Sequence, residues 1–417
     1  MLENLHSALG LALISVSATA PQPLDPAHAI VEFSTYCANS RPIWRKSLCG
    51  PLLFVDPATK TAVASFNPGV AGFHREGPVW VGPLPPNIGI ANTSVEIAGK
   101  RVAEILLPLP ADALERRILI SHESFHRIQP ALGFKGAEAD NGHLDERDAR
   151  IYARLEVEAL KAALTRKTWR AAAREALSYR AARMARYPQA RAAEGSLIAN
   201  EGIAEYTGLR VGAGVRARSV ALQRLDGVTD RPSLIRSFGY VVGPAYGLLL
   251  DRTNQRWRTA ALKGEPMPDL LANALGGRVR QQPAMARYGG ARIAAEETAR
   301  DSKIQARKSE LTARLVDGPT VTFAFESMNI DFNPNTVFAL GDAGNVYSQA
   351  TKIRDHWGAL SATGELLLSP DWKFARAPGP ARIDGRTVSG PGWSAELAPG
   401  YSMVPGDRPG DYRLRKD

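Results

Sequence analysis

The pentad His122-Glu123-Ser124-Phe125-His126 is an H-E-x-x-H pattern inside a stretch that the sequence predicts to be helical. Residues four apart stack on one face of a helix, so both imidazoles can hold one metal ion while Glu123 reaches a water molecule beside it. With only seven histidines in 417 residues, the pattern would arise by chance in roughly one such chain in a hundred or fewer. We therefore predict a metal centre that activates water, with two unrelated helical histidines as the alternative.

The ends of this helix are also marked in the sequence. Asp112 is a candidate N-cap, and Glu115 follows three residues later, which makes a D-x-x-E capping box. Pro130 cannot continue a helix and is expected to stop this one. These signals delimit one helix around the pentad.

A catalytic zinc needs three protein ligands and an open position, so a carboxylate must complete the set. The best candidate lies in Asn200-Glu201-Gly202-Ile203-Ala204-Glu205-Tyr206. This segment is close to the N-E-G-F-A-E-Y of the aminopeptidase N group, and the chain thus resembles the gluzincin-type zinc metallopeptidases. The resemblance implies that Glu201 is the third zinc ligand. It also implies that Glu205, one helical turn later, holds a zinc-binding histidine from behind, as in thermolysin-like enzymes.

The spacing leaves other acids open as the third ligand. Between His126 and Glu201 lie 74 residues (201 − 126 − 1), far more than in the aminopeptidase N group, so we expect two inserted helices. Asp145 has 18 residues between it and His126 (145 − 126 − 1), which is the gluzincin-like distance, but it also suits a helix N-cap. Glu156 and Glu158 are further alternatives.

A donor is also needed for the oxyanion that develops in peptide hydrolysis. The segment Gly239 to Ala245 (GYVVGPA) resembles the Y-x-K-G-x segment of the aminopeptidase N group, although a valine replaces the lysine. The resemblance implies that Tyr240 is the oxyanion donor, with a plain core tyrosine as the alternative. Tyr206 and Tyr246 are substitutes for this role, and His143 is a loop residue that could reach the cleft.

One departure from the family bears on specificity. Aminopeptidases of that group carry G-x-M-E-N on the strand beside the cleft, where its glutamate grips the free amino terminus of the substrate. The corresponding stretch here is Gly89-Ile90-Ala91-Asn92, without a glutamate. The sequence therefore leaves endopeptidase and exopeptidase activity open.

Composition places the chain among ordinary folded proteins. Hydrophobic residues make up 44% and charged residues 23%, and the net charge is +10. Much of the basic excess lies in Ala/Arg-rich helices such as Arg166 to Arg186, and no nucleic-acid-binding motif accompanies it. We therefore expect a solvated helix face and no nucleic-acid partner. The sequence also contains no apolar run of transmembrane length.

The N-terminus is expected to direct export to the periplasm or out of the cell. Ala8 to Val16 is a short apolar run, followed by small residues that allow cleavage after Ala18, Ala20 or Ala29. The preceding residues lack Lys and Arg, so an apolar N-terminal helix of a cytoplasmic protein is the alternative. The pair Cys37 and Cys49 fits export as a small disulfide loop, with two buried thiols as the other possibility.

The chain is expected to fold as an α+β protein with a zincin-like core, a small sheet plus a helical bundle that carries the pentad. Buried-strand and hairpin patterns in Pro51–Val55 and Val95–Leu109 predict the sheet, and Ala98-Gly99 marks the turn. The expected segments are 1–29 (signal or apolar segment), 30–110 (β-rich part of the catalytic domain), 111–295 (helical domain with the zinc site), 296–315 (linker helix) and 316–417 (β-rich C-terminal domain). We expect the metal centre not to need residues 316–417.

Together these features predict a zinc-dependent hydrolase with one Zn²⁺ per chain. A peptidase acting on a peptide or protein is favoured, with ligands His122, His126 and Glu201 and with Glu123 as general base. The alternative is a catalytically inactive metal-binding or cell-envelope interaction protein on a zincin scaffold. The sequence does not indicate the oligomeric state.

Overall fold

The computed structural model describes residues 25–417 except 135–139, 254–255, 277–278, 281–282 and 334–335. The expected signal segment thus lies almost entirely outside the described residues. The chain divides after Glu297 into two compact units, an N-terminal unit up to Glu297 and a C-terminal unit from Thr298 to Asp417. Among the described residues, no helix combines the length and the apolar character that a bilayer span requires.

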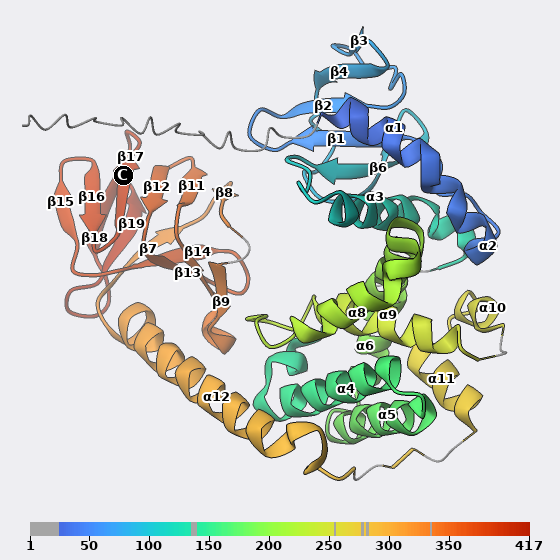
Figure 1. The fold of residues 1–417 in the computed structure, drawn as a ribbon. Coiled ribbons are helices and arrows are strands. Elements are labelled where there is room, and N and C mark those ends of the chain that lie inside the picture. The colour runs from blue at the N-terminus through green and yellow to red at the C-terminus, as the bar shows by residue number, and fades with distance from the viewer. Residues whose placement is uncertain (1–24, 135–139, 254–255, 277–278, 281–282, 334–335) are drawn as a thin grey trace, which may run out of the picture. The chain divides into compact units, whose positions relative to one another are not determined.

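The N-terminal unit combines one mixed sheet with a set of helices (Figure 1). Its strands are β1 (Leu52–Asp56), β2 (Thr61–Ala64), β3 (His74–Glu76), β4 (Val79–Pro83), β5 (Thr93–Ile97) and β6 (Lys100–Leu106). Its helices are α1 (Pro26–Tyr36), α2 (Arg41–Trp44), α3 (Ala113–Ile128), α4 (Arg147–Thr165), α5 (Trp169–Arg186), α6 (Ala190–Leu197), α7 (Ile203–Gly208), α8 (Ala217–Asp226), α9 (Phe238–Leu250), α10 (Trp257–Ala261) and α11 (Met267–Leu275). Short turns are the 3₁₀ elements η1 (Cys37–Ser40), η2 (Pro130–Leu132), η3 (Gly142–Asp145), η6 (Gly214–Arg216) and η7 (Arg287–Gly289), and the π-helical η4 (Ile198–Gly202) and η5 (Leu209–Ala213).

The sheet has the strand order β3-β4-β2-β1-β6-β5, so β5 is an edge strand. Strand β1 pairs in parallel with β6 and antiparallel with β2. The expected hairpin joins β5 to β6, and its turn residues Ala98 and Gly99 both have positive φ, 49° and 73°. This geometry matches the right-handed twist of the two strands. The hairpin therefore places the edge strand beside the helix that follows it.

Helix α3 lies along one face of this sheet (Figure 1). The side chains of Phe54 in β1 and Ile105 in β6 point to that face. They share one apolar core with Ile118 and Phe125 of α3. The opposite face forms a smaller core around Leu53 and neighbouring strand residues. The two cores fix the height and direction of α3 over the sheet.

The start of the chain differs from the expected β-rich segment. Helix α1 begins at Pro26, which follows the N-cap Asp25, and it buries Ala29 and Phe33 in the main core. The expected boundary at residue 29 therefore falls inside a helix, where Ala29 is fully buried. The buried residues of α1 are spaced by three and four positions, which is typical of an amphipathic helix. This spacing was the sequence signal for a helix here.

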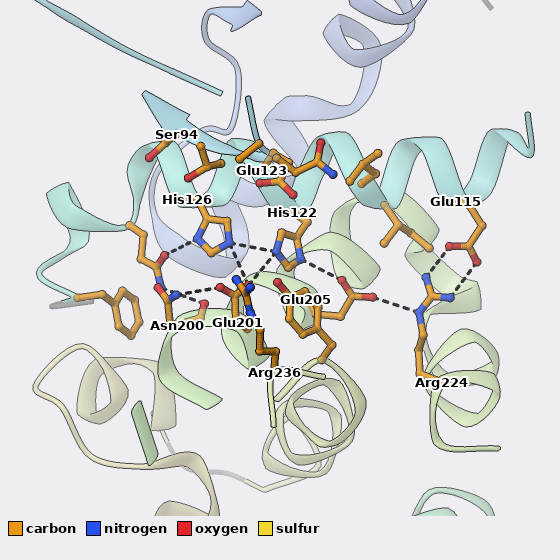
Figure 2. Close-up of a pocket in the computed structure, with 18 of the residues that line it drawn as sticks. Ser94, Glu115, His122, Glu123, His126, Asn200, Glu201, Glu205, Arg224 and Arg236 are labelled. Carbon is orange, nitrogen blue, oxygen red and sulfur yellow. Dashed lines mark hydrogen bonds and ion pairs between the residues drawn. The ribbon is translucent and has the colours of Figure 1, made fainter. Parts of the chain in front are cut away.

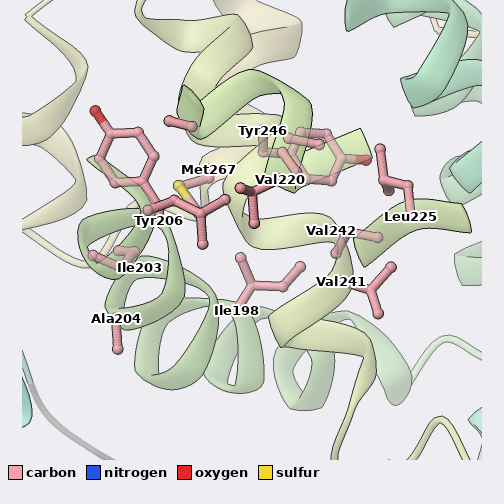
Figure 3. Close-up of a cluster of buried hydrophobic side chains, with 14 of the residues drawn as sticks. Ile198, Ile203, Ala204, Tyr206, Val220, Leu225, Val241, Val242, Tyr246 and Met267 are labelled. Carbon is pink, nitrogen blue, oxygen red and sulfur yellow. The ribbon is translucent and has the colours of Figure 1, made fainter. Parts of the chain in front are cut away.

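The same apolar core continues among the helices that follow α5. Figure 3 shows Ile198 and Ile203 facing Val241, Val242 and their neighbours from α8 and α9. The expected insertion between the pentad and Glu201 consists mainly of helices α4 and α5, which pack against each other. Burial of these side chains fixes where α9 crosses the run from α6 to α7.

The C-terminal unit is a β-sandwich, in line with the β-rich domain expected after residue 316. One sheet has the order β18-β19-β7-β14-β13-β10-β9 and the other the order β15-β16-β17-β12-β11-β8. Phe323, Trp357 and Trp393 meet in the core between them. Its strands are β7 (Thr320–Ala324), β8 (Asn329–Asp331), β9 (Val337–Ala339), β10 (Asn345–Ser348), β11 (Thr351–Asp355), β12 (Gly358–Ala362), β13 (Glu365–Leu368), β14 (Phe374–Pro378), β15 (Arg382–Asp384), β16 (Thr387–Gly390), β17 (Trp393–Leu397), β18 (Tyr401–Pro405) and β19 (Tyr412–Lys416).

The division between the units falls within helix α12 (Gly290–Thr312), which π-turn η8 (Ala313–Asp317) extends. The last part of α12 and the turn η8 belong to the C-terminal unit. There Leu311 and Leu315 pack on Val346 and Leu367. The chain as a whole is an α+β protein, as the sequence predicts.

Candidate metal centre

Helix α3 carries the pentad as the sequence predicts. Asp112 caps the helix by accepting a hydrogen bond from the Glu115 backbone N–H at 2.9 Å, and the helix ends at Ile128, before Pro130. His122 and Glu123 are almost fully buried. The three pentad side chains point to the same cavity (Figure 2).

The second half of the site comes from the helical run that contains Glu201 and Glu205. This run is not a regular α-helix, because Glu201 lies in the π-helical turn η4 between α6 and α7. A π-turn adds one residue to a helical turn and is frequent at functional sites. Here it lets Glu201 and Glu205 reach the same histidine, His122, from two directions (Figure 2).

Glycines bring these helices close together. A Cβ atom at Gly208 would lie 3.0 Å from the Ile118 carbonyl oxygen, and one at Gly212 would lie 2.7 Å from the Arg117 backbone. On the other side, a Cβ at Gly243 of α9 would lie 2.2 Å from the Cα of Gly202. The run from η4 to η5 is therefore held between α3 and α9 at distances that only glycine permits.

Three potential metal-binding atoms form a small triangle. His122 Nε2 lies 3.0 Å from His126 Nε2, and Glu201 Oε2 lies 3.4 Å and 3.3 Å from these two nitrogens. A triangle with these sides has its centre about 1.9 Å from each corner, close to the roughly 2.0–2.1 Å of zinc bonds to nitrogen and oxygen. The atoms are therefore spaced as the ligands of one zinc-sized ion.

The outer hydrogen bonds of both imidazoles show which nitrogen is free. His122 Nδ1 lies 2.9 Å from Glu205 Oε2, and His126 Nδ1 lies 2.8 Å from Gln129 Oε1. A carboxylate oxygen and an amide oxygen only accept, so both Nδ1 atoms donate. In the neutral rings both Nε2 atoms then carry lone pairs, and these face each other and Glu201. Such an arrangement of electron-pair donors can hold a proton or a metal ion between them.

The position of Gln129 is itself fixed. Its Nε2 donates to the carbonyl oxygens of Ala199 and Asn200, at 3.1 and 3.2 Å, which turns its Oε1 toward His126. Gln129 was not predicted as a site residue. Its position three residues after His126 was the available signal, because such residues are neighbours on a helix.

The carboxylate of Glu201 is held at Oε1 by a hydrogen bond, and its Oε2 faces the two histidines. Asn200 Nδ2 donates to Glu201 Oε1 at 2.9 Å, whereas the buried Oε2 has no hydrogen-bond partner within the described part of the chain. Burial raises the pKa of this carboxyl, but His122 and His126 lower it well below its usual range. Burial likewise lowers the pKa of His122, but Glu201 and Glu205 raise it to about 10. Both shifts arise because the ionised carboxylates and a protonated imidazole stabilise each other.

Glu123 also offers an oxygen near the histidines, and its group with His122 and His126 spans up to 4.8 Å. Glu201 Oε2 lies within 3.4 Å of both nitrogens, which makes Glu201 the candidate for the third ligand. Glu123 Oε2 is buried without a hydrogen-bond partner among the described residues. Burial raises the pKa of Glu123, and the two histidines oppose this rise. A carboxylate of this kind suits a general base better than a ligand.

Tyr240 lines the same cavity, as expected of an oxyanion donor. Its ring stacks on His122 with the centroids 5.3 Å apart and the planes 2° apart. Burial and the Glu201 carboxylate raise the pKa of its hydroxyl, so the group keeps its proton. The substitutes lie elsewhere: the hydroxyl of Tyr206 donates to Asp251, and that of Tyr246 points to Glu156.

The competing ligands do not lie among the residues that line the cavity. Asp145 accepts a hydrogen bond from the Leu234 backbone N–H and pairs with Arg150. Glu156 is fully buried beside Arg183, and Glu158 pairs with Lys161. Local helix signals could not exclude Asp145 and Glu156, because Leu234 and Arg183, which bind them, come from distant segments. His143, which was considered able to reach the cleft, instead lies 2.9 Å from a Glu194 carboxylate oxygen.

The cavity around the triangle has a volume of about 690 Å³. One wall is the segment from Ala91 to Ser94, at the start of edge strand β5. Two arginines, Arg224 and Arg236, also line the cavity, together with the acids described above. Arg224 pairs with Glu115 and with the oxygen of Glu205 that does not face His122. Neither arginine belongs to a sequence motif, so neither was predicted to lie at the site.

Comparisons of the chain with protein family models, with curated proteins and with solved structures find no match.

Proposed function

We propose that the chain is a zinc-dependent hydrolase and that its substrate is a peptide. The observation that carries the proposal is the triangle of His122 Nε2, His126 Nε2 and Glu201 Oε2, in which three electron-pair donors lie within 3.4 Å of one another. Two nitrogens and one carboxylate oxygen with an open side are the donor set of a catalytic zinc. The resemblance to gluzincin-type metallopeptidases supports the same donor set.

The charges of the cavity also favour a dication. Its lining contains four carboxylates and two guanidinium groups, a difference of two negative charges (4 − 2) when all are ionised. A bound Zn²⁺ would balance this difference, polarise the scissile carbonyl and make the attacking water more acidic. The lining acids are Glu115, Glu123, Glu201 and Glu205, and the lining bases are Arg224 and Arg236.

Two side chains of the protein carry out the remaining steps, proton transfer and stabilisation of the oxyanion. Glu123 accepts a proton from the attacking water through its unpartnered oxygen and delivers it to the leaving amine. The hydroxyl of Tyr240 donates to the oxygen that becomes negative on the scissile carbonyl. An unpartnered base beside the donor triangle favours a catalytic site over a purely metal-binding one.

The cavity wall suits an extended peptide. Strand β5 is at the edge of its sheet, and its first residues line the cavity. An edge strand offers backbone N–H and C=O groups that a substrate chain can pair with. This feature favours a peptide over small ester or amide substrates.

We further propose that the protein is exported. Cys37 and Cys49 form a disulfide, with their Cα atoms 4.9 Å apart. Disulfides persist in the periplasm and outside the cell and are rare in the cytosol. This supports export independently of the N-terminal segment.

Metal content tests the proposed function. We expect one zinc per chain in the purified protein and loss of zinc in Glu201→Ala, which removes one ligand. Glu158→Ala is the matched control, because it removes a carboxylate that pairs with Lys161 and does not line the cavity. The zinc-loaded protein should then cleave members of a peptide library. Absence of bound metal in the wild-type protein would refute the proposal.

A further inference from the structure

Arg236 brings a guanidinium group to the cavity. It lies in the loop between α8 and α9, four residues before Tyr240, and its side chain is exposed rather than packed in the core. It lines the same cavity as the proposed metal-binding triangle, and Figure 2 draws its side chain among the lining residues. Its position therefore allows it to meet a ligand bound at the metal centre.

The two arginines of the cavity differ in their partners. Arg224 is neutralised by Glu115 and Glu205, at 2.5 and 3.2 Å. For Arg236, in contrast, the structure has no ion pair with any acid in the described part of the chain. Arg236 thus brings to the cavity a guanidinium group that no described acid pairs with directly.

The acids of the cavity are all engaged. Glu115 and Glu205 pair with Arg224, Glu201 belongs to the donor triangle, and Glu123 is reserved for the attacking water. The wall segment Ala91 to Ser94 adds no charge. A substrate ammonium group would therefore find no free carboxylate, whereas a substrate carboxylate would find a free guanidinium group.

We propose that Arg236 anchors a carboxylate of the substrate close to the scissile bond. A guanidinium group binds a carboxylate through two parallel hydrogen bonds, which gives both affinity and orientation. The carboxylate can be the free C-terminus of a short peptide or the side chain of an aspartate or glutamate. The inference rests on the proposed function for the identity of the substrate as a peptide.

Binding of matched peptides tests this inference. The zinc-loaded Glu123→Gln protein, which should not hydrolyse them, is titrated calorimetrically with acetyl-trialanine as its free acid and as its amide. A second pair is the same tripeptide amide with a central glutamate or a central glutamine. We expect an acid to bind roughly 10- to 100-fold more tightly than its neutral partner, the size of a hydrogen-bonded charge pair. The pair that shows the difference identifies the source of the carboxylate.

Variants then assign the preference to one side chain. Adding Arg236→Ala should abolish the difference, and Arg236→Lys should keep part of it, because lysine retains the charge without the planar fork. Arg216→Ala is the control, since Arg216 is exposed and does not line the cavity. The inference is overturned if acids and neutral partners bind alike, if no peptide binds, or if the preference survives Arg236→Ala.

Zinc measurements on the same samples separate this inference from the proposed function. If the protein binds zinc but binds acid and neutral peptides alike, the metal centre is supported and the role of Arg236 is refuted. An acid preference without zinc would retain the carboxylate site and remove the hydrolase.

Discussion

Gly202 and Gly243 touch at the crossing of η4 and α9, so closely that a Cβ on Gly243 would lie 2.2 Å from the Cα of Gly202. Glu201 precedes one of these glycines, and Tyr240 lies three residues before the other. The contact therefore sets the distance between Glu201 and Tyr240, the proposed metal ligand and the proposed oxyanion donor.

Gly243→Ala should push these two helices apart. We expect a loss of about 2–4 kcal/mol in the free energy of unfolding, as for overpacking against backbone, together with weaker zinc binding. Gly195→Ala is the control, because a Cβ at Gly195 would meet only Pro266, at 3.7 Å. Denaturant unfolding and chelator competition measure the two effects, and equal behaviour of the two variants would contradict the prediction.

Glu123→Gln should retain the fold and bound zinc but lose hydrolysis. An amide cannot accept the proton from the attacking water, and removal of a general base costs roughly 10²- to 10⁴-fold in rate. The comparison is made on kcat for any library peptide that the wild-type protein cleaves. Undiminished turnover with zinc bound would assign the proton transfer to another residue.

Glu205→Ala should weaken zinc binding without removing a ligand. Glu205 holds the Nδ1–H of His122, and loss of such a partner typically costs roughly 10- to 100-fold in metal affinity. Glu205→Gln keeps an acceptor oxygen and should lose less. Competition with a chelator gives both affinities, and wild-type affinity in Glu205→Ala would show that the hydrogen bond is dispensable.

Glu104 predicts a pH-dependent stability. This fully buried residue of β6 accepts a hydrogen bond from the Ala91 N–H at one oxygen, and the other has no partner among the described residues. Burial raises its pKa from 4.5 to about 7, although the Ala91 hydrogen bond lowers it. Between these values the folded chain holds a proton that the unfolded chain has lost, so stability falls as the pH rises from about 4.5 to about 7.

Glu104→Gln removes the unfavourable free energy of burying the ionised Glu104 carboxylate. Relative to the wild type, the variant should gain about 1–3 kcal/mol at pH 8 and little at pH 4.5, since each pKa unit corresponds to roughly 1.4 kcal/mol. Thermal unfolding of both metal-free proteins at the two pH values measures the difference. A gain of the same size at both pH values would mean that the charge of Glu104 is not the cause.

The N-terminal unit alone should retain the metal centre. Every residue proposed for the centre precedes Glu297, so residues 25–297 should bind one zinc and unfold cooperatively. The fragment must begin before α1, because Ala29 belongs to its core. It must also end before Leu311 and Leu315, which pack in the C-terminal unit. Loss of zinc from this fragment would show that the C-terminal unit supports the site.

The sequence by itself determined the features that depend on neighbouring residues. The capping of α3 by Asp112, the common face of His122 and His126, and the turn at Ala98-Gly99 follow from helix periodicity and turn geometry. Each involves residues within a few positions of one another, so their spacing in the chain fixes their spacing in space. The resemblance at Glu201 added one distant residue to this set.

Tertiary structure alone decided which distant side chains meet. Spacing left Asp145 and Glu156 open as ligands, but in the fold Asp145 accepts a hydrogen bond from the Leu234 backbone and Glu156 pairs with the buried Arg183, and neither lines the cavity. The π-turn that aims Glu201 depends on how closely glycines allow helices to approach, which no local propensity records. The free charge of Arg236 is likewise a property of its surroundings. Long-range packing selects among many locally equivalent acids and arginines, and for that reason the sequence predicts the histidine pair and Glu201 but not the residues that surround them.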